Sequence, residues 1–204
     1  MISSKYIENA VNEIASLQGV GKRTALRYVL DLAGRSEEDI ERFIKSIHDL
    51  KTHVKPCKIC HNLSDTDICN ICSSPNRDQS IICVVEDIRD VLAIEATHQY
   101  KGLYHVLGGK ISPMDGIGPS DLNVGTLLER MEKNEVNELI LALSATMEGD
   151  TTSYYVYKKL EKNEHLITST LSRGVPVGDE LQYTDEVTLG RSIVQRTPYD
   201  KSLQ

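Results

Sequence analysis

Apolar residues recur at helical spacing along the first part of the chain. Positions about one helical turn apart are apolar in two runs: Ile7, Val11, Ile14 and Leu17, then Ala25, Leu26, Val29 and Leu30. The first run predicts a helix from about Lys5 to Ser16, and the second predicts a helix that ends at Gly34. Ser36 is a suitable N-cap for a third helix over Glu37–Leu50. The N-terminal region is therefore expected to contain three helices.

The pattern changes from residue 80 onward, where short apolar runs alternate with helical periodicity. The run IICVVE, residues 81–86, is β-branched, too short for a helix and typical of a strand buried on both faces. Further strands are predicted at Leu103–Leu107, Glu138–Leu143 and Leu166–Thr170, and helices at Ile88–His98, Leu122–Lys133 and Thr152–Lys162. Alternating strands and helices indicate a parallel sheet covered on both sides, so the expected fold class is α/β.

Three segments lack a regular pattern. Residues 55–78 are rich in turn residues and too few to form an apolar core of their own. A glycine-rich loop is predicted at Gly108–Gly118. From Arg173 the chain holds glycines and prolines with short β-like pieces, which predicts an extended C-terminal tail.

Composition places the chain among folded globular proteins. It has 204 residues, of which 40% are hydrophobic and 26% charged. No apolar run approaches the roughly 20 residues of a membrane span, and the N-terminus lacks the apolar core of a secretory signal. A cytoplasmic protein without membrane association is therefore expected, in which the five cysteines are thiols or metal ligands rather than disulfides.

Charge is distributed unevenly along the chain. The formal net charge is −7, but residues 1–55 carry 9 basic against 8 acidic side chains. Residues 86–204 carry 12 basic against 19 acidic side chains. Any polyanionic partner is therefore expected near the N-terminus.

Four of the five cysteines form two closely spaced pairs. Cys57 and Cys60 make the first C-x2-C pair, and Cys69 and Cys72 make the second after eight intervening residues. Each pair can place two thiolates on one metal ion, and the loop between them folds the pairs into a tetrahedron. The spacing therefore predicts one structural zinc ion per chain, with no open coordination position for catalysis.

Other interpretations of the cysteines are weaker. Redox-active pairs normally open a helix after a strand, and neither pair has that context. His61 is an alternative ligand.

Lys55 and Lys58 flank the first pair, where positive charge is expected to ease the build-up of anionic sulfur. Cys83 lies inside a predicted buried strand and is expected to be a core residue.

A turn with two glycines joins the first two predicted helices. Gly19 and Gly21 permit a tight turn, after which the second helix presents unpaired N–H groups and the positive end of its dipole. Lys22, Arg23 and, further along, Arg27 add positive charge. This arrangement suits a phosphate group and predicts DNA binding without regard to sequence. The alternative is an ordinary helical hairpin with solvated basic residues.

Acidic residues follow two of the predicted strands. Glu86 ends the first strand, and Glu148 and Asp150 follow the third. The carboxyl ends of parallel strands share one edge of a sheet, where ligands usually bind. Three carboxylates at that edge could hold Mg²⁺ for phosphoryl-transfer chemistry. Solvated loop acids, or acids that contact another subunit, are the equally weighted alternative.

The order of these features resembles that of the RecR family of bacterial recombination mediators. The resemblance covers essentially the whole chain and rests on these stretches: LQGVGKRTALR, CKIC with CNIC, CVVE, HVLGGKISPMDGIGP, MEGDTTSYYV and RGVPVGDELQYTDEVTLGRSI. The sequence departs from the family's usual pattern in two places. Ser144-Ala145-Thr146 stands where Asn-Pro-Thr is common, and Asp150 stands where Glu is usual.

The resemblance implies a four-part organisation. It comprises a helix-hairpin-helix DNA-binding region (1–54), a four-cysteine zinc finger (55–78), a Toprim domain (79–172) and a C-terminal segment (173–204). It assigns DNA contact to Lys22, Arg23 and Arg27. It assigns the binding of partner proteins, more than catalysis, to the three acids at the sheet edge.

The resemblance also implies a function. The family forms ring-like tetramers that can surround DNA, and it works with RecO and RecF to load RecA onto single-stranded DNA. A non-catalytic clamp in DNA repair, associated with the bacterial nucleoid, is therefore expected. The alternatives are an Mg²⁺-dependent Toprim enzyme, primase-like or nuclease-like, and an RNA-binding or regulatory zinc protein. An enzyme would need a denser metal cluster, for which Asp115 and Asp121 are candidates.

Overall fold

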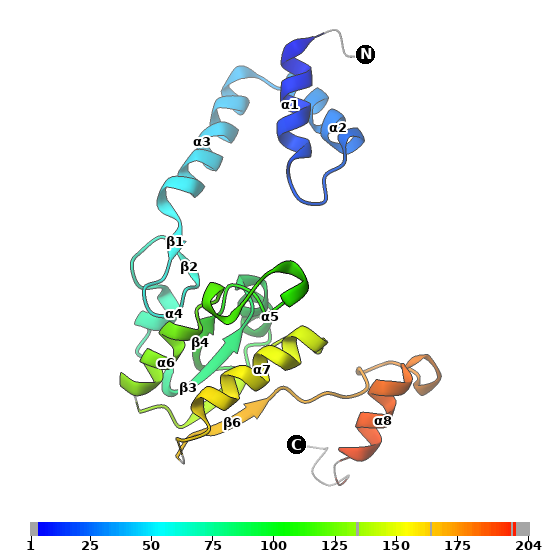
Figure 1. Ribbon diagram of the computed structural model, residues 1–204. Coiled ribbons are helices and arrows are strands. Elements are labelled where there is room, and N and C mark those ends of the chain that lie inside the picture. Colours follow the sequence, from blue (N-terminus) through cyan, green and yellow to red (C-terminus); the bar gives the residue numbers. More distant parts are fainter. Residues whose placement is uncertain (1–3, 134, 164, 197, 199–204) are drawn as a thin grey trace. The chain divides into compact units, whose positions relative to one another are not determined.

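The computed structural model describes residues 4–133, 135–163, 165–196 and 198 (Figure 1). The chain divides into two compact units, Met1–Val54 and Lys55–Gln204. In the part of the chain that the structure describes, no helix combines the length and apolar character needed to cross a membrane.

The first unit contains the three predicted helices, α1 (Lys5–Ala15), α2 (Lys22–Ala33) and α3 (Glu37–His53). Side chains cap two of them, since Ser4 accepts a hydrogen bond from the Ile7 N–H and Ser36 accepts one from the Asp39 N–H. The first two helices pack through a small core of buried residues: Val11, Ala25 and Val29.

The third helix of this unit has no buried residue. Its apolar side chains nevertheless recur at helical spacing along one stripe: Phe43, Ile44, Ile47 and Leu50, which are 45–60% exposed. An amphipathic helix with an uncovered apolar stripe is stable mainly when another surface covers it. We call these four residues the α3 stripe.

The second unit begins with the cysteine segment. Two short antiparallel strands, β1 (Lys55–Pro56) and β2 (Leu63–Ser64), precede the one-turn helix α4 (Asn70–Ser73). The segment has no apolar core beyond the cysteines and Ile71. A backbone hydrogen bond from the Val106 N–H to the Cys60 carbonyl (2.8 Å) joins it to the sheet.

A four-stranded parallel sheet forms the centre of the second unit. Its strands are β3 (Asp78–Val85), β4 (Gly102–Val106), β5 (Glu138–Leu141) and β6 (Ile167–Thr170), in the order β4-β3-β5-β6. The helices are α5 (Ile88–Ala96), α6 (Val124–Lys133) and α7 (Met147–Leu160). The α/β class and the parallel sheet predicted from the sequence are thus confirmed.

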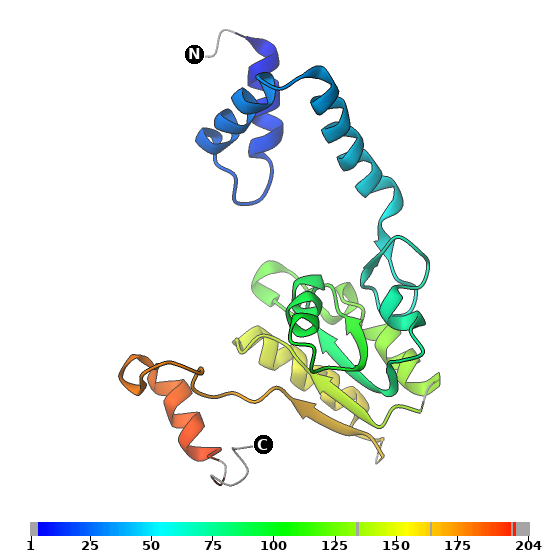
Figure 2. The same ribbon diagram turned by 180° about the vertical axis from the view of Figure 1, so that it is seen from behind.

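The sheet is buried on both faces, as the β-branched run in its first strand predicts. On one face Ile82 and Val84 pack with residues of α6 and α7, such as Leu127 and Val156. On the other face Cys83 and Val85 pack with Val91 of α5. Figures 1 and 2 show these two sides in turn, with α7 in front of the sheet in Figure 1. Cys83 is therefore a core residue, and burial raises the pKa of its thiol to about 12.

The structure corrects two boundaries. Helix α7 begins at Met147, five residues before the predicted start, because Thr146 caps it and accepts a hydrogen bond from the Gly149 N–H. The tail after residue 173 was predicted to be extended with short β-like pieces, and this was wrong for its second half. There Asp185 caps a helix, α8 (Glu186–Val194), with its side chain on the Thr188 N–H.

Candidate functional sites

The four predicted metal ligands lie together. The sulfur atoms of Cys57, Cys60, Cys69 and Cys72 all lie within 4.8 Å of one another, and those of Cys60 and Cys69 are 3.5 Å apart. Four thiolates around one zinc ion at about 2.3 Å would be separated by about 3.8 Å. The cluster therefore fits a tetrahedral zinc site.

Backbone N–H groups donate hydrogen bonds to two of the sulfur atoms. The N–H of Cys69 donates to the Cys57 sulfur (3.3 Å), and the N–H of Cys72 donates to the Cys69 sulfur (3.5 Å). Burial opposes ionisation of Cys57, but backbone N–H groups, first that of Cys69, outweigh it and bring its pKa down to about 7. Burial raises the pKa of Cys69 to about 11. One thiolate is thus available near neutral pH, and metal binding must displace the remaining protons.

Three residues that flank the cluster make contacts outside it. His61 is not part of the sulfur cluster, and its Nε2 lies 2.8 Å from the Thr126 hydroxyl on α6. Lys55 and Lys58 both form ion pairs with Asp67, the latter at 2.6 Å. Their charge is therefore shared with a carboxylate rather than directed at sulfur alone.

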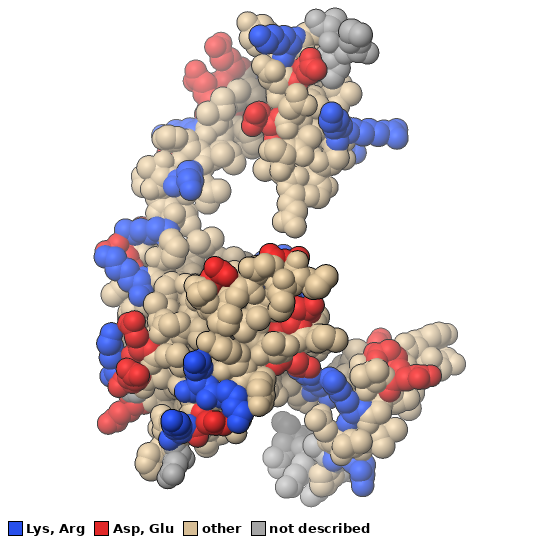
Figure 3. All heavy atoms as spheres, in the orientation of Figure 1, with Lys and Arg blue, Asp and Glu red and all other residues tan. Residues whose placement is uncertain are grey.

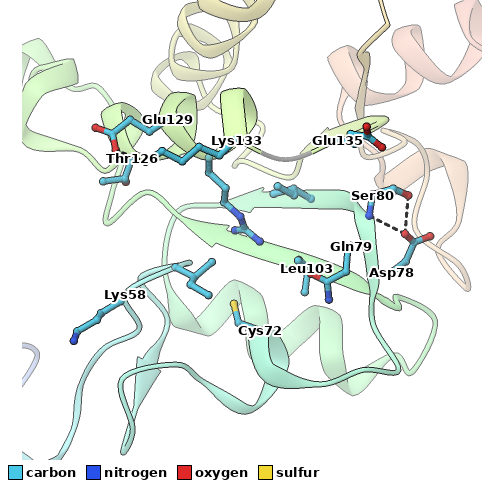
Figure 4. A pocket seen from close by; sticks show the side chains of 13 residues that line it. Lys58, Cys72, Asp78, Gln79, Ser80, Leu103, Thr126, Glu129, Lys133 and Glu135 are labelled. Carbon is cyan, nitrogen blue, oxygen red and sulfur yellow. Dashed lines mark hydrogen bonds and ion pairs between the residues drawn. The ribbon is translucent and has the colours of Figure 1, made fainter.

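An open hollow of about 890 Å³ lies beside the zinc cluster. Lys58 and Cys72 line it from the cysteine segment, Leu103 from β4 and Lys133 from α6 (Figure 4). Its remaining charged residues have both signs, so it has no single electrostatic character. Cys72 is the zinc ligand that reaches solvent here, because the other three cysteines are buried.

The glycine turn leaves the start of α2 open. Gly19 has a φ of +80°, which favours glycine, whereas Gly21 has an ordinary extended conformation. Gly21 is the N-cap of α2 and provides no side-chain cap. A Cβ added at either glycine would meet nothing within 4 Å. The first N–H groups of α2 therefore face open space.

Three basic side chains surround this open helix end. Lys22, Arg23 and Arg27 are exposed, and none belongs to an ion pair among the described residues. Figure 3 shows basic side chains standing clear of this unit on its α2 side. The Arg27 guanidinium lies 5.4 Å from the centre of the Tyr28 ring. Positive charge here is therefore not neutralised by the described acids.

The three predicted acids lie at the carboxyl ends of β3 and β5. Glu86 follows β3, and its Oε1 accepts a hydrogen bond from the Ser144 N–H (2.7 Å) beyond β5. Glu148 and Asp150 lie in the first turn of α7, where the helix dipole favours negative charge. We call Glu86, Glu148 and Asp150 the carboxylate edge.

Gly149 fixes the approach of α7 to this edge. A Cβ at this position would lie 2.0 Å from the carbonyl oxygen of Ser144. Only a residue without a side chain allows the helix to start so close to the strand end. Gly149 is therefore the residue that lets α7 begin there.

Two basic residues at the edge were not predicted from the sequence. Lys110, in the glycine-rich loop, lies 3.9 Å from the Glu86 carboxylate. Arg173, from the C-terminal segment, donates hydrogen bonds to both carboxylate oxygens of Asp150, one of them at 3.2 Å. This guanidinium holds the pKa of Asp150 below its usual value. Contacts between residues so far apart in sequence leave no local pattern, which explains why they were missed.

Among the described residues, the acids of the carboxylate edge do not gather into one multi-carboxylate cluster. Within the described residues, the cysteine cluster is the one group of three or more His, Cys, Asp or Glu side chains whose ligand atoms converge. Asp115 accepts a hydrogen bond from Ser112 (2.6 Å), and Asp121 accepts one from the Gly118 N–H (2.8 Å), so both stabilise turns of the loop.

Comparison with known proteins matches three parts of the chain to family models. These are the Toprim domain for residues 80–171, the four-cysteine zinc finger domain of RecR for residues 54–74, and the C-terminal region of RecR for residues 174–197. Several curated relatives are named "Recombination protein RecR". That of Phocaeicola vulgatus is 59% identical over 194 residues, which cover 95% of this chain and 94% of the relative.

Two further relatives extend the similarity to nearly the full chain. The protein of Bacteroides fragilis is 58% identical over 96% of this chain and 95% of its own length. That of Flavobacterium johnsoniae is 54% identical over 99% of this chain and 98% of its own. The chain belongs to the RecR family. Its four clustered cysteines are the zinc finger of that family and hold one structural zinc ion, and RecR membership supports a role in recombination and repair.

Proposed function

We propose that this RecR-family protein is a non-catalytic DNA-binding scaffold in recombinational repair. Together with RecO and RecF it helps to load RecA onto single-stranded DNA, in the bacterial cytoplasm at the nucleoid. One observation carries the DNA-binding part of this proposal. The uncapped start of α2 faces open space and is surrounded by Lys22, Arg23 and Arg27, none of which is paired with a described acid.

The proposed contact is to the DNA backbone. Backbone N–H groups at a helix N-terminus and nearby cations bind phosphate, which carries no sequence information. The glycine turn is therefore the DNA-contact site, and its affinity depends strongly on salt.

A ring of subunits would reconcile an acidic chain with DNA binding. One turn supplies a weak contact, and several turns around one lumen add by avidity. The uncovered α3 stripe supports association of copies through the N-terminal region. We propose a homo-oligomer, tetrameric as the family resemblance implies.

The carboxylate edge is the proposed site for partner proteins. Glu148 and Asp150 are at the surface of the first turn of α7, where a basic surface of RecO or RecF can reach them. The alternative function, a metal-dependent Toprim enzyme, is less well supported because the acids do not converge on one point. Metal-dependent cleavage or synthesis of DNA that is lost in Glu86→Gln would establish the enzyme instead.

The test of the DNA-contact site is the double variant Lys22→Ala/Arg23→Ala. We expect weaker binding to all DNA sequences alike, and a plot of log affinity against log salt that is shallower by about 1.5 to 2. The matched control is Lys45→Ala/Lys51→Ala, which removes two exposed cations from α3. Unchanged affinity in the Lys22/Arg23 variant would exclude the turn.

A second variant tests the helix end without changing charge. Gly21→Ser has room for its side chain, and its hydroxyl can cap the α2 N–H groups that phosphate would otherwise bind. We expect equal or greater thermal stability together with weaker DNA binding. Full DNA affinity in this variant would limit the site to the basic side chains.

A further inference from the structure

Lys110 lies at the carboxylate edge, beside Glu86. Its Nζ lies 3.9 Å from Glu86 Oε2, 3.3 Å from the Ser144 hydroxyl and 3.4 Å from the Thr146 hydroxyl. These oxygens come from the end of β3, the segment after β5 and the N-cap of α7. One ammonium group therefore joins three elements through an oxygen-lined position.

The pair formed by Lys110 and Glu86 is partly shielded from solvent. The two side chains are 31% and 18% exposed, and the second Glu86 oxygen is already bound by the Ser144 N–H. Charges in such a position are screened less than those of an exposed ion pair. The positive charge of the Lys110 ammonium therefore offsets much of the negative charge of the Glu86 carboxylate.

The other acids of the edge also have cations or donors from this chain. Arg173 pairs with Asp150 through two hydrogen bonds. The pKa of Glu148 is held low by its own backbone N–H and by the Thr146 side chain, and the charge of Lys110 adds to this.

Mg²⁺ fits poorly at this edge. It requires oxygen ligands in a near-octahedral arrangement at about 2.0–2.1 Å, usually with one or two carboxylates. A divalent ion on Glu86 would lie close to the ammonium of Lys110, and the repulsion between them would oppose binding. Among the described residues, the three acids also do not converge on one point.

We infer that Lys110 is the built-in cation of the carboxylate edge, so that the edge holds its charge balance without a divalent metal ion. The lysine connects the glycine-rich loop to β3 and α7, a connection that in a metal-binding site an ion would provide. Arg173 has the corresponding role at Asp150. The carboxylate edge is therefore assembled in the absence of Mg²⁺.

The test measures metal binding by zinc-loaded protein, so that the cysteines are already occupied. Mn²⁺ is titrated as a paramagnetic probe into the wild type, Lys110→Gln and Lys162→Gln. Lys162 is an exposed control that follows the far end of α7, roughly 20 Å along the helix from Thr146. Glutamine keeps the hydrogen-bonding capacity of Lys110 and removes its charge.

We expect the wild type and Lys162→Gln to show no saturable Mn²⁺ site at millimolar metal. Lys110→Gln is expected to gain one such site, with an affinity for Mn²⁺ on the order of tenfold or more above the weak binding of the wild type. This site should be lost again when Glu86→Gln is added. Saturable Mn²⁺ binding by the wild type that depends on Glu86 would overturn the inference. So would the absence of a new site in a folded Lys110→Gln.

The wild-type measurement keeps the inference testable even if Lys110→Gln does not fold. Lys110→Arg then serves as the second variant, since it keeps the positive charge. It is expected to remain metal-free, and a saturable Glu86-dependent Mn²⁺ site in it would also overturn the inference. Neither result depends on whether the protein binds DNA.

Discussion

At the scale of single residues, Gly149 determines how closely α7 approaches the sheet. A methyl group there would lie 2.0 Å from a backbone oxygen, that of Ser144, so the helix start must shift. We expect Gly149→Ala to lower the free energy of unfolding by about 2 kcal/mol or more. The control is Gly125→Ala in α6, where an added Cβ meets nothing within 4 Å. That change is expected to be neutral or stabilising by less than about 1 kcal/mol.

Chemical denaturation of both variants measures these two effects. Equal stability of Gly149→Ala and Gly125→Ala would contradict the assigned role of the close approach. A separate assay is the binding of the proposed partners, RecO or RecF, to Gly149→Ala at a temperature where this variant is folded. It reports whether a shift of the α7 start displaces the acids of the carboxylate edge.

His105 is expected to make stability depend on pH. It is fully buried on β4, its Nε2 donates to the Asn123 carbonyl (2.9 Å), and its Nδ1 has no hydrogen-bond partner among the described residues. Burial lowers its pKa to about 4, compared with about 6.5 in an unfolded chain. Below pH 6.5 the unfolded state therefore takes up a proton that the folded state does not. Stability is lost as the pH falls from about 6.5 to about 4, by about 3 kcal/mol in total.

The variant His105→Gln removes this titration. Its free energy of unfolding is expected to change less between pH 7 and pH 5 than that of the wild type, while His48→Gln, at an exposed position on α3, follows the wild type. Zinc content is measured in parallel at each pH, because acid also protonates the cysteines. Identical pH profiles for His105→Gln and the wild type would show that His105 is not buried in its neutral form.

Residue chemistry could be predicted from the sequence where it depends on short spacing. The C-x2-C pairs identified the zinc ligands because each pair must bind through its own local loop. The roles of Lys110 and Arg173 could not be predicted in this way. Each contacts an acid 23 or 24 residues away in the sequence, through folding of a loop and of the C-terminal segment.

At the scale of elements, the zinc segment is expected to hold local structure rather than support a reaction. It has almost no apolar core and is joined to β4 by the hydrogen bond between Val106 and Cys60. Removal of zinc with a chelator should lower the melting temperature and increase hydrogen exchange in residues 55–78 and in β4. Exchange in α1 and α2 should not change, because these helices have their own core.

Two cysteine variants distinguish the effect of losing zinc from the effect of losing a buried thiol. Cys69→Ser is expected to lose zinc and to show the same exchange pattern as the chelated protein. Cys83→Ser, which alters a buried cysteine outside the cluster, should keep one zinc ion per chain. Unchanged exchange in residues 55–78 after zinc removal would refute a structural role for the metal.

Helix and strand positions were predictable where a periodic apolar pattern faces a core. The strands β3, β4 and β5 and the helices α1, α2, α5 and α6 satisfy this condition, whereas the edge strand β6 does not, since Ile167 is 65% exposed. Helix α8 does not, since Val187, Ile193 and Val194 are 60–78% exposed and Gly190 interrupts its sequence. Its start is instead determined by the Asp185 cap, which the glycines and prolines before it obscured.

At the scale of the whole molecule, the α3 stripe is a candidate contact surface for the proposed homo-oligomer. Phe43, Ile44, Ile47 and Leu50 are not covered by the other helices of their own unit, which is unfavourable for four large apolar side chains on one helix face. A second copy of the chain, with the same stripe, is the simplest surface to cover it. We therefore expect Ile44→Glu/Ile47→Glu to reduce the mass of the assembly measured by light scattering.

The double variant should leave the fold of each subunit intact. Both side chains are more than half exposed, so glutamate meets no buried surface within the subunit and helix content should be unchanged. Ser46→Glu/His48→Glu is the matched control, because it adds two acids and the same formal charge at exposed positions outside the stripe. An unchanged mass for Ile44→Glu/Ile47→Glu would place the subunit contacts elsewhere. A smaller assembly should in turn bind DNA more weakly with the glycine turn unaltered, because avidity requires several turns on one DNA molecule.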